Sequence, residues 1–310
     1  MTTGIATKTA HAIGIERARP GRPIIQLDDQ CVVSIRGGTV ITIDGEKVAF
    51  GRDTQIASEP FIPGKDYAIG INSEGELYIK LANENPLNGK TFAGFHFAPS
   101  GNATATNGGD GVPAINPYSL WDIGFRPSCP DPRGMAIVET AAGKLFWADI
   151  YLLGVNHIKN GTSAQGVMIA DGDDLPVRIG GEGTYDRCHF TAVSEIYAHH
   201  GKRLLGAEEF FAAAYGVKER ASRDEEPTLT GSLEDNAARF ISRWGLFDIT
   251  GTMWQWGTDG HPDDPRPSIF GGSWIDGSYA GSRGAHLDYW AELSSGGLGA
   301  RGASDHLKLD

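Results

Sequence analysis

The sequence predicts an α+β protein, in which a small antiparallel β domain precedes a larger domain with its helices first and its β structure last. Apolar and polar residues alternate with period 2 between residues 31 and 81. Three segments within residues 190–245 instead space apolar residues as a helix does, and glycine- and tryptophan-rich segments follow them. Helices first and β structure last are typical of the α+β class.

An N-terminal arm is expected over residues 1–30, which are polar and contain Pro20 and Pro23. Such a segment forms an arm or short strands that need a partner, so it is a candidate for oligomerisation. Residues 31–117 are expected to form the small β domain. Within it, residues 39–43 and 46–50 alternate around an Asp-Gly pair, which favours a hairpin with a type I′ turn.

A second hairpin is predicted between residues 67–71 and 77–79, across the polar segment 72–76. The glycine-rich residues 99–117 are expected to be a linker or a long loop. The large domain then extends over residues 118–310.

Three helices are predicted in the large domain, each with an apolar face and a glycine at its end. No helical pattern follows the third one. The helices cover residues 190–200, 207–215 and 232–244, and end at Gly201, Gly216 and Gly245.

Composition excludes several classes of protein. The formal charge of −12 and a pI near 5.2 disfavour binding to nucleic acid or to anionic lipid. Cys31, Cys129 and Cys188 form no CxxC pair, which argues against a disulfide framework and against a cysteine-based zinc site. The N-terminus lacks the apolar core of a signal peptide, and no long apolar run follows, so we expect synthesis in the cytoplasm without membrane insertion.

Motifs in the second half of the chain resemble the C-type lectin fold of formylglycine-generating-enzyme-like proteins. The resemblance implies a lectin fold for residues 118–310. The segments that carry it are Gly201-Lys-Arg-Leu204, Ala207-Glu-Glu-Phe-Phe-Ala-Ala-Ala-Tyr-Gly216, Leu246-Phe-Asp-Ile-Thr-Gly-Thr-Met-Trp-Gln-Trp256 and Gly271-Gly-Ser-Trp274.

From about residue 35 onward the chain is also similar to the phage tropism determinants, the variable proteins of diversity-generating retroelements. That resemblance implies a homotrimer, although the part before Cys31 does not match the interlocking trimerisation segment of the family. The similar segments include Gly94-Phe-His-Phe-Ala-Pro99, Tyr118-Ser-Leu-Trp-Asp-Ile123, Phe146-Trp-Ala-Asp-Ile-Tyr-Leu-Leu-Gly-Val-Asn-His157, Gly281-Ser-Arg283, Gly299-Ala-Arg-Gly302 and Asp305-His-Leu307.

The resemblance also implies a variable region over residues 271–307, with twelve receptor-binding positions. In that family an adenine-specific process diversifies codons that never yield Lys, Glu, Gln, Met or Trp, and none of the twelve residues here is of these types. The positions are Ser273, Ile275, Gly277, Tyr279, His286, Leu287, Asp288, Tyr289, Leu293, Ser295, Gly297 and Leu298.

If residues 273–279 form a strand, alternate side chains point to opposite faces. Trp274 is the expected core anchor, so Ser273, Ile275, Gly277 and Tyr279 would face outward. Tyr279, Tyr289 and Leu293 are the expected contact anchors, and Trp290 is expected in the core. The expected scaffold residues are Trp274, Gly281, Ser282, Arg283, Gly299, Arg301 and Asp305.

The candidate catalytic and metal-binding residues lack the motifs of known sites. A hydrolase built on Ser282, His286 and Asp288, or on Asp305 and His306, lacks a GxSxG motif. His199-His200 lacks HExxH spacing, and the acidic runs 171–174 and 259–264 do not match an EF-hand. We therefore expect no catalytic residue, no metal and no cofactor.

The resulting prediction is a receptor-binding protein at a phage tail-fibre tip, located in the virion and diversified by a retroelement. Its expected partner is a host cell-surface receptor, itself a protein. One alternative is a formylglycine-generating-enzyme-like oxidoreductase, which the absence of cysteine after Cys188 disfavours. Another is a structural fibre protein whose twelve positions do not vary.

Overall fold

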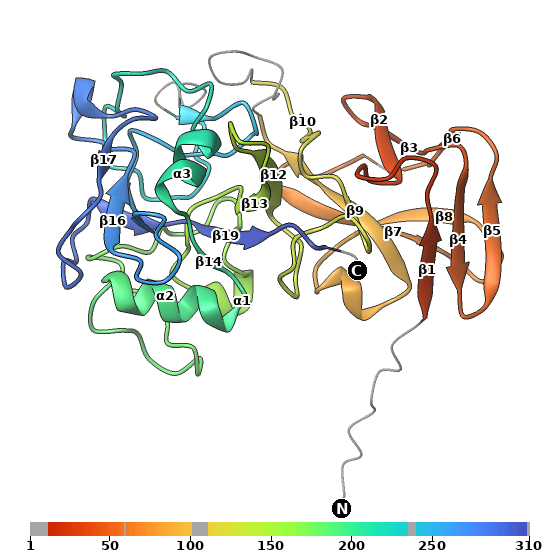
Figure 1. The fold of residues 1–310 in the computed structure, drawn as a ribbon, viewed down its shortest axis with the longest axis horizontal. Coiled ribbons are helices and arrows are strands. Elements are labelled where there is room, and N and C mark those ends of the chain that lie inside the picture. Colours follow the sequence, from red (N-terminus) through yellow and green to blue (C-terminus); the bar gives the residue numbers. More distant parts are fainter. Residues whose placement is uncertain (1–11, 59, 101–110, 235–239, 309–310) are drawn as a thin grey trace, which may run out of the picture.

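The computed structural model describes residues 12–58, 60–100, 111–234 and 240–308. Two regions lie next to each other along its long axis (Figure 1). The N-terminal third, coloured red to yellow, lies on the right of that view, and most of the rest lies on the left. The part of the expected linker that covers residues 101–110 lies outside the described residues.

The first predicted hairpin is confirmed. β4 (Thr39–Ile43) and β5 (Glu46–Phe50) pair around Asp44 and Gly45, whose φ angles are 51° and 93°. A type I′ turn requires positive φ at both central residues, and glycine adopts it without steric cost.

Residues 12–30, the described part of the expected arm, find partner strands within their own chain; residues 1–11 lie outside the described residues. β1 (Ile13–Glu16) pairs with β4, and β2 (Ile25–Asp29) pairs with β3 (Val32–Ile35), which also pairs with β6 (Thr54–Gln55). Just after β1, Arg17 forms an ion pair with the buried Asp122, with an N–O distance of 2.8 Å. This ion pair attaches the N-terminal segment to Asp122, which lies at the C-terminal end of the β region.

The second predicted hairpin is also confirmed, by β7 (Lys65–Ile71) and β8 (Leu77–Leu81). The Oδ1 atom of Asn72 accepts hydrogen bonds from the backbone N–H groups of Glu74 and Glu76, which shapes the turn. The remaining elements are β9 (Thr91–Ala98), which is buried along its whole length, its partners β10 (Ala114–Ile115) and β11 (Trp121–Asp122), and the 3-10 turn η1 (Pro86–Asn88).

Two of the three predicted helices are confirmed. α2 (Phe190–His199) buries Val193, Ile196 and Tyr197 as expected, and α3 (Ala207–Ala213) follows it. Gly201 and Gly216 stand just beyond the two helices with φ angles of 67° and 95°, values that favour glycine at a helix end. A four-residue helix, α1 (His157–Asn160), was not predicted.

The third predicted helix is wrong at both of its ends, and its centre, residues 235–239, lies outside the described residues. Residues 232–234 and 241–244 are not α-helical. The hydroxyl of Ser242 accepts hydrogen bonds from the backbone N–H groups of Trp244 and Leu246, which replaces helical pairing with a local turn. The indole N–H of Trp244 donates to the carbonyl of Ala212 at 2.8 Å. The apolar spacing of this segment therefore reflects packing against α3.

Two four-stranded sheets build the C-terminal region, and α3 contacts both of them. Phe210 of α3 stacks on Phe270 with ring centroids 4.9 Å apart, and both belong to one buried apolar cluster. In order, the sheets are β12 (Met135–Glu139), β13 (Leu145–Asp149), β19 (Gly302–Asp305) and β14 (Arg203–Leu204), and β17 (Ala285–His286), β16 (Pro267–Phe270), β15 (Trp254–Thr258) and β18 (Leu298–Ala300).

Buried polar contacts join the two regions. The Nε2 atom of His96, on β9, lies 2.9 Å from the hydroxyl of Tyr151. The carboxylate of Asp66, on β7, accepts a hydrogen bond from the backbone N–H of Gly134 at 3.0 Å. The second region is therefore built directly onto the sheet that contains β7 and β9.

Candidate functional site

Residues 271–298 form loops around β17, at the left end of the molecule in Figure 1. Of the twelve positions expected to bind a receptor, seven are exposed, three are half-buried and two are buried. The exposed ones are Ile275, Gly277, Tyr279, His286, Leu287, Asp288 and Ser295; the half-buried ones are Tyr289, Leu293 and Gly297; the buried ones are Ser273 and Leu298.

The prediction that Ser273 points outward is wrong, because Ser273 is only 2% exposed. Its backbone N–H and its hydroxyl both donate to Oδ2 of Asp276, at 2.6 and 2.5 Å. These bonds close a turn, and the chain continues as a short 3-10 helix, η3 (Gly277–Tyr279). Strand alternation fails here because it applies only to an extended chain.

Leu298 is a core residue, contrary to the expectation of a surface position. It begins β18, which runs parallel to β15 with Leu298 opposite Trp254. Its side chain lies in a buried cluster with Trp256 and Ile269. Replacing it therefore changes the interior as well as the surface.

An aromatic layer supports the exposed loop residues. The ring of His286 lies 5.2 Å from that of Trp254 and 5.5 Å from that of Tyr289. Tyr289 in turn contacts Trp256, with ring centroids 6.4 Å apart. Tyr289 and Leu293 therefore have one side on the buried cluster and the other at the surface.

Large apolar side chains gather in this segment without being buried. Tyr279 is 85% exposed, Ile275 70%, Trp290 68% and Leu287 48%. The prediction that Trp290 lies in the core is therefore wrong. Exposed apolar groups concentrated in one segment are typical of a surface that binds a partner.

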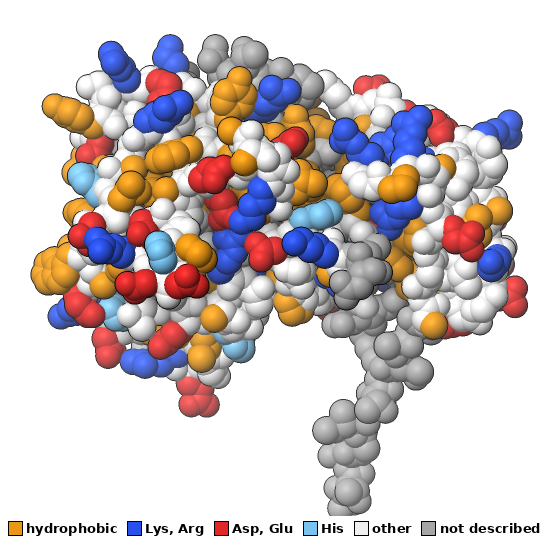
Figure 2. Space-filling model, viewed as in Figure 1, with side chains coloured by type: hydrophobic (Ala, Val, Ile, Leu, Met, Phe, Trp, Pro, Cys, Tyr) orange, Lys and Arg blue, Asp and Glu red, His pale blue; other side chains and the backbone are white. Residues whose placement is uncertain are grey.

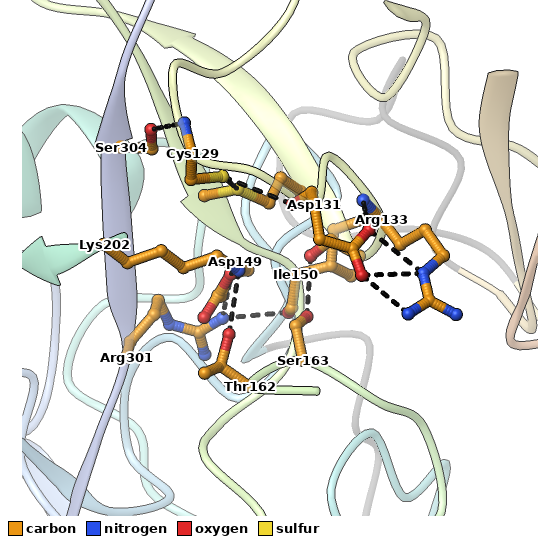
Figure 3. A network of polar contacts seen from close by, with 12 residues as sticks. Cys129, Asp131, Arg133, Asp149, Ile150, Thr162, Ser163, Lys202, Arg301 and Ser304 are labelled. Atoms are coloured by element: carbon orange, nitrogen blue, oxygen red, sulfur yellow. Dashed lines mark hydrogen bonds and ion pairs between the residues drawn. The ribbon is translucent and has the colours of Figure 1, made fainter. Parts of the chain in front are cut away.

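A buried arginine secures the strands that follow the loops. Arg301 is fully buried, and its guanidinium donates to the carbonyls of Asp149 and Ile150 (Figure 3). It also donates to the carbonyl of Phe247 and to the side chain of Gln255. Burial lowers the pKa of Arg301 to about 10, so the group stays charged at neutral pH. The expected scaffold role of Arg301 agrees with this geometry.

A buried ion pair lies beside Arg301. The ammonium of Lys202 lies 2.5 Å from Oδ1 of Asp149 and 2.8 Å from the hydroxyl of Thr162 (Figure 3). Burial acts to lower the pKa of Lys202, but the charge and hydrogen bond of Asp149, together with the neighbouring Cys129 and Asp131, raise that pKa above its ordinary value. Breaking such a pair from one side leaves an uncompensated buried charge, which is strongly destabilising.

Another contact, which the sequence did not reveal, ties the loops of residues 271–298 to the rest of the domain. The carboxylate of Glu219 accepts hydrogen bonds from the hydroxyl and the backbone N–H of Ser282. Of the other scaffold residues, Gly281 and Gly299 are buried and Trp274 is half-buried, whereas Arg283 and Asp305 are exposed. Glu219 shows no motif in the sequence, because only the fold brings it to Ser282.

The hydrolase arrangements are not assembled. The hydroxyl of Ser282 is bonded to Glu219, Asp288 pairs with Arg266 at 3.7 Å, and within the described residues no hydrogen bond joins either of them to His286. His306 accepts a hydrogen bond from the indole of Trp147 at 3.0 Å. These contacts give the side chains structural partners.

The candidate metal ligands also have structural partners. Nδ1 of His157 lies 2.9 Å from Nε2 of His200, so the two rings are hydrogen-bonded to each other. Asp171 accepts two backbone hydrogen bonds within its own loop, and burial raises its pKa to about 6. Across the described residues no group of three or more His, Cys, Asp or Glu side chains is placed to hold a metal ion.

None of the helices in the described ranges combines the length and the apolar character that crossing a bilayer requires.

Comparison with known proteins finds relatives over most of the chain. The family model described as the Mtd second domain matches residues 24–122. The tail fiber receptor-binding protein of Bordetella phage BPP-1 is 37% identical, and the match covers 89% of this chain and 80% of that protein.

Solved structures are similar over nearly the same extent. The I1 variant of the major tropism determinant matches with a TM-score of 0.85 and 36% identity, over 95% of this chain and 86% of that one. The M1 variant matches with a TM-score of 0.85 and 34% identity, over 96% of this chain and 86% of that one. The predicted α+β architecture with a C-type lectin fold is thereby confirmed. By identity and by coverage, this chain belongs to the family of the major tropism determinants.

Proposed function

We propose that this protein binds a receptor on the host cell surface from the tip of a phage tail fibre, and so determines which host is recognised. The observation that carries the proposal is the group of exposed apolar residues at 275–290 on loops that a buried polar frame secures. The relative from Bordetella phage BPP-1 is named a tail fiber receptor-binding protein, which supports the same role here.

The proposal includes diversification of residues 271–307 by a retroelement. A surface that accepts many side chains must be separate from the core, because core replacements commonly cost about 2–5 kcal/mol. Seven exposed positions among the twelve meet that requirement. The DNA downstream of the gene should hold a near-copy of the codons for residues 271–307 and a reverse transcriptase reading frame, and population sequencing should show changes at adenine positions. A uniform sequence would favour an invariant fibre protein instead.

We further propose that the receptor is a protein and that this chain acts as a homotrimer. Several linked copies raise the effective affinity by about 10² to 10⁴ when each site binds weakly. Light scattering coupled to size-exclusion chromatography should give three times the chain mass of 33.1 kDa. A monomer at micromolar concentration would contradict the trimer but not the receptor-binding role.

No catalysis is part of the proposed function. Burial raises the pKa of the Cys129 thiol, and it raises that of the Cys188 thiol to about 12, so neither is a thiolate at neutral pH. Cys31 is exposed, in the β region. Conversion of a peptide cysteine to formylglycine by the purified protein would support the oxidoreductase alternative.

The deciding experiment measures binding of labelled full-length protein to a panel of bacterial strains, with the unlabelled protein as competitor. Ile275→Ala and Tyr279→Ala should lower binding to the recognised strain by about tenfold or more each, as anchors of an interface do. Ile62→Ala is the matched control, since Ile62 is 53% exposed in the β region. Equal binding of all three variants would overturn the proposal.

A further inference from the structure

A groove of about 730 Å³ lies beside the exposed loop. One wall comes from residues 215–220, which follow α3, and the other from residues 278–284. The rings of Tyr215 and Tyr279 line it and are largely exposed. Figure 2 shows hydrophobic and basic side chains next to each other at this end of the molecule. The groove thus joins a segment outside the expected variable region to one inside it.

Two arginines give the groove a local positive charge in a chain whose net charge is −12. Arg220 and Arg283 are exposed, and neither guanidinium forms a salt bridge or a side-chain hydrogen bond within the described part of the chain. The groove also contains Glu219, but the hydroxyl and N–H of Ser282 each bind one of its oxygens. Two guanidinium groups therefore remain available for an anionic ligand.

The backbone holds the groove in a defined shape. Arg220 has a φ angle of 57°, a conformation that is unfavourable for residues other than glycine. Its N–H donates to the carbonyl of Ala280 at 3.0 Å, which ties the two walls together close to the Glu219–Ser282 contact. Strained residues that the surrounding structure maintains tend to cluster at functional sites.

We propose that this groove binds an acidic segment of the receptor protein, with a carboxylate between Arg220 and Arg283 and neighbouring side chains against Tyr215 and Tyr279. Arginine pairs with carboxylates through two parallel hydrogen bonds, and tyrosine offers a rigid apolar face beside them. The groove would serve a receptor-binding protein, so the proposal rests on the proposed function. Tyr215 and Arg220 lie outside residues 271–307 and would supply a constant part of recognition, whereas Tyr279 would vary.

Calorimetric titration of the full-length protein with a blocked oligoglutamate peptide tests this directly. We expect binding that weakens with added salt, and no binding of the matching oligoglutamine peptide. Arg220→Gln and Arg283→Gln should each lower the affinity for oligoglutamate by about tenfold, since hydrogen bonds to charged groups are the strong ones. Arg52→Gln removes the same charge from an exposed site in the β region and should have no effect.

Several outcomes would overturn the groove proposal. These are no oligoglutamate binding at millimolar concentration, equal binding by the groove variants and Arg52→Gln, or inorganic phosphate binding as tightly as the peptide, which would indicate a general anion site. Urea unfolding of each variant shows whether it is folded, and Arg283→Gln avoids the strained backbone of Arg220. If Ile275→Ala lowers cell binding but the protein does not bind oligoglutamate, the groove proposal is rejected and the proposed function stands. Peptide binding without any cell binding would reject the proposed function.

Discussion

Arg301 and Gln255 are bonded to each other in the interior, with Nε of the arginine 2.9 Å from Oε1 of the glutamine. Gln255 donates from its Nε2 atom to the carbonyls of Asp248 and Ile249, at 3.0 and 2.9 Å. Because Arg301 stands between β18 and β19, this chain of bonds fixes the point at which the loops of residues 271–298 return to the core.

Arg301→Met should lower the free energy of unfolding by about 3 kcal/mol or more, because it leaves several buried acceptors without donors. Urea unfolding followed by tryptophan fluorescence measures the change. Arg283→Met, at an exposed arginine nearby, should stay within about 0.5 kcal/mol of the wild type. Similar losses in the two variants would contradict a structural role for the Arg301 network.

Leu298→Ala should cost about 2–5 kcal/mol of stability, as other truncations of buried leucine do. Ser295→Ala, three residues earlier and exposed, should change stability by no more than about 0.5 kcal/mol. The two variants compare a buried and an exposed position of the same proposed variable set. If Leu298→Ala proved as mild as Ser295→Ala, Leu298 would not be the core residue described above.

Trp290→Ala should leave the free energy of unfolding within about 0.5 kcal/mol of the wild type, because the side chain is largely exposed. Iodide quenching of tryptophan fluorescence provides the check, since the variant should lose the most readily quenched part of the emission. Trp256→Phe, at a fully buried ring, should leave that part in place. Unchanged quenching in Trp290→Ala would mean that the side chain is buried in solution.

The histidine pair should make stability depend on pH. Burial, with the charges of His157 and Lys202, lowers the pKa of His200 to about 4, from 6.5 in an unfolded chain. The folded state favours neutral His200, so its contribution is complete above pH 6.5 and declines as the pH falls towards 4. Asp171, whose pKa is raised to about 6, acts in the opposite direction below that pH.

Comparison with His200→Gln separates the two effects, because glutamine does not titrate. The urea midpoint of the wild type should fall relative to that of the variant between pH 6.5 and 4.5. Parallel curves for the two proteins would show that His200 does not titrate in this way.

Local signals in the sequence predicted local structure well. The Asp44-Gly45 pair gave a hairpin because both residues accept positive φ, and α2 and α3 formed where an apolar stripe ends at glycine. Each of these features depends on residues that are neighbours in the chain.

Features that depend on distant partners could not be predicted in this way. Leu298 is buried by its pairing with β15, and the apolar spacing before Gly245 reflects the anchoring of Trp244 on α3. Ser273 is a different case, because its partner Asp276 is only three residues away, and the expectation of a strand overlooked this local turn. The groove contact between Glu219 and Ser282 has no sequence signature, because the two segments meet only in the folded chain. The sequence therefore predicted that most of the twelve positions lie at the surface, but it did not distinguish the buried Ser273 and Leu298 from the exposed ones.

Ser273 and Leu298, the two buried positions, stand at opposite ends of the proposed variable set. Many substitutions at either of these positions would prevent the protein from folding, so they would be lost before any receptor is bound. Substitutions at the seven exposed positions would leave the fold intact and change only receptor binding. The number of distinct proteins that a phage population can deploy would then be far smaller than the number of sequences it encodes, with the shortfall concentrated at the two ends of the segment.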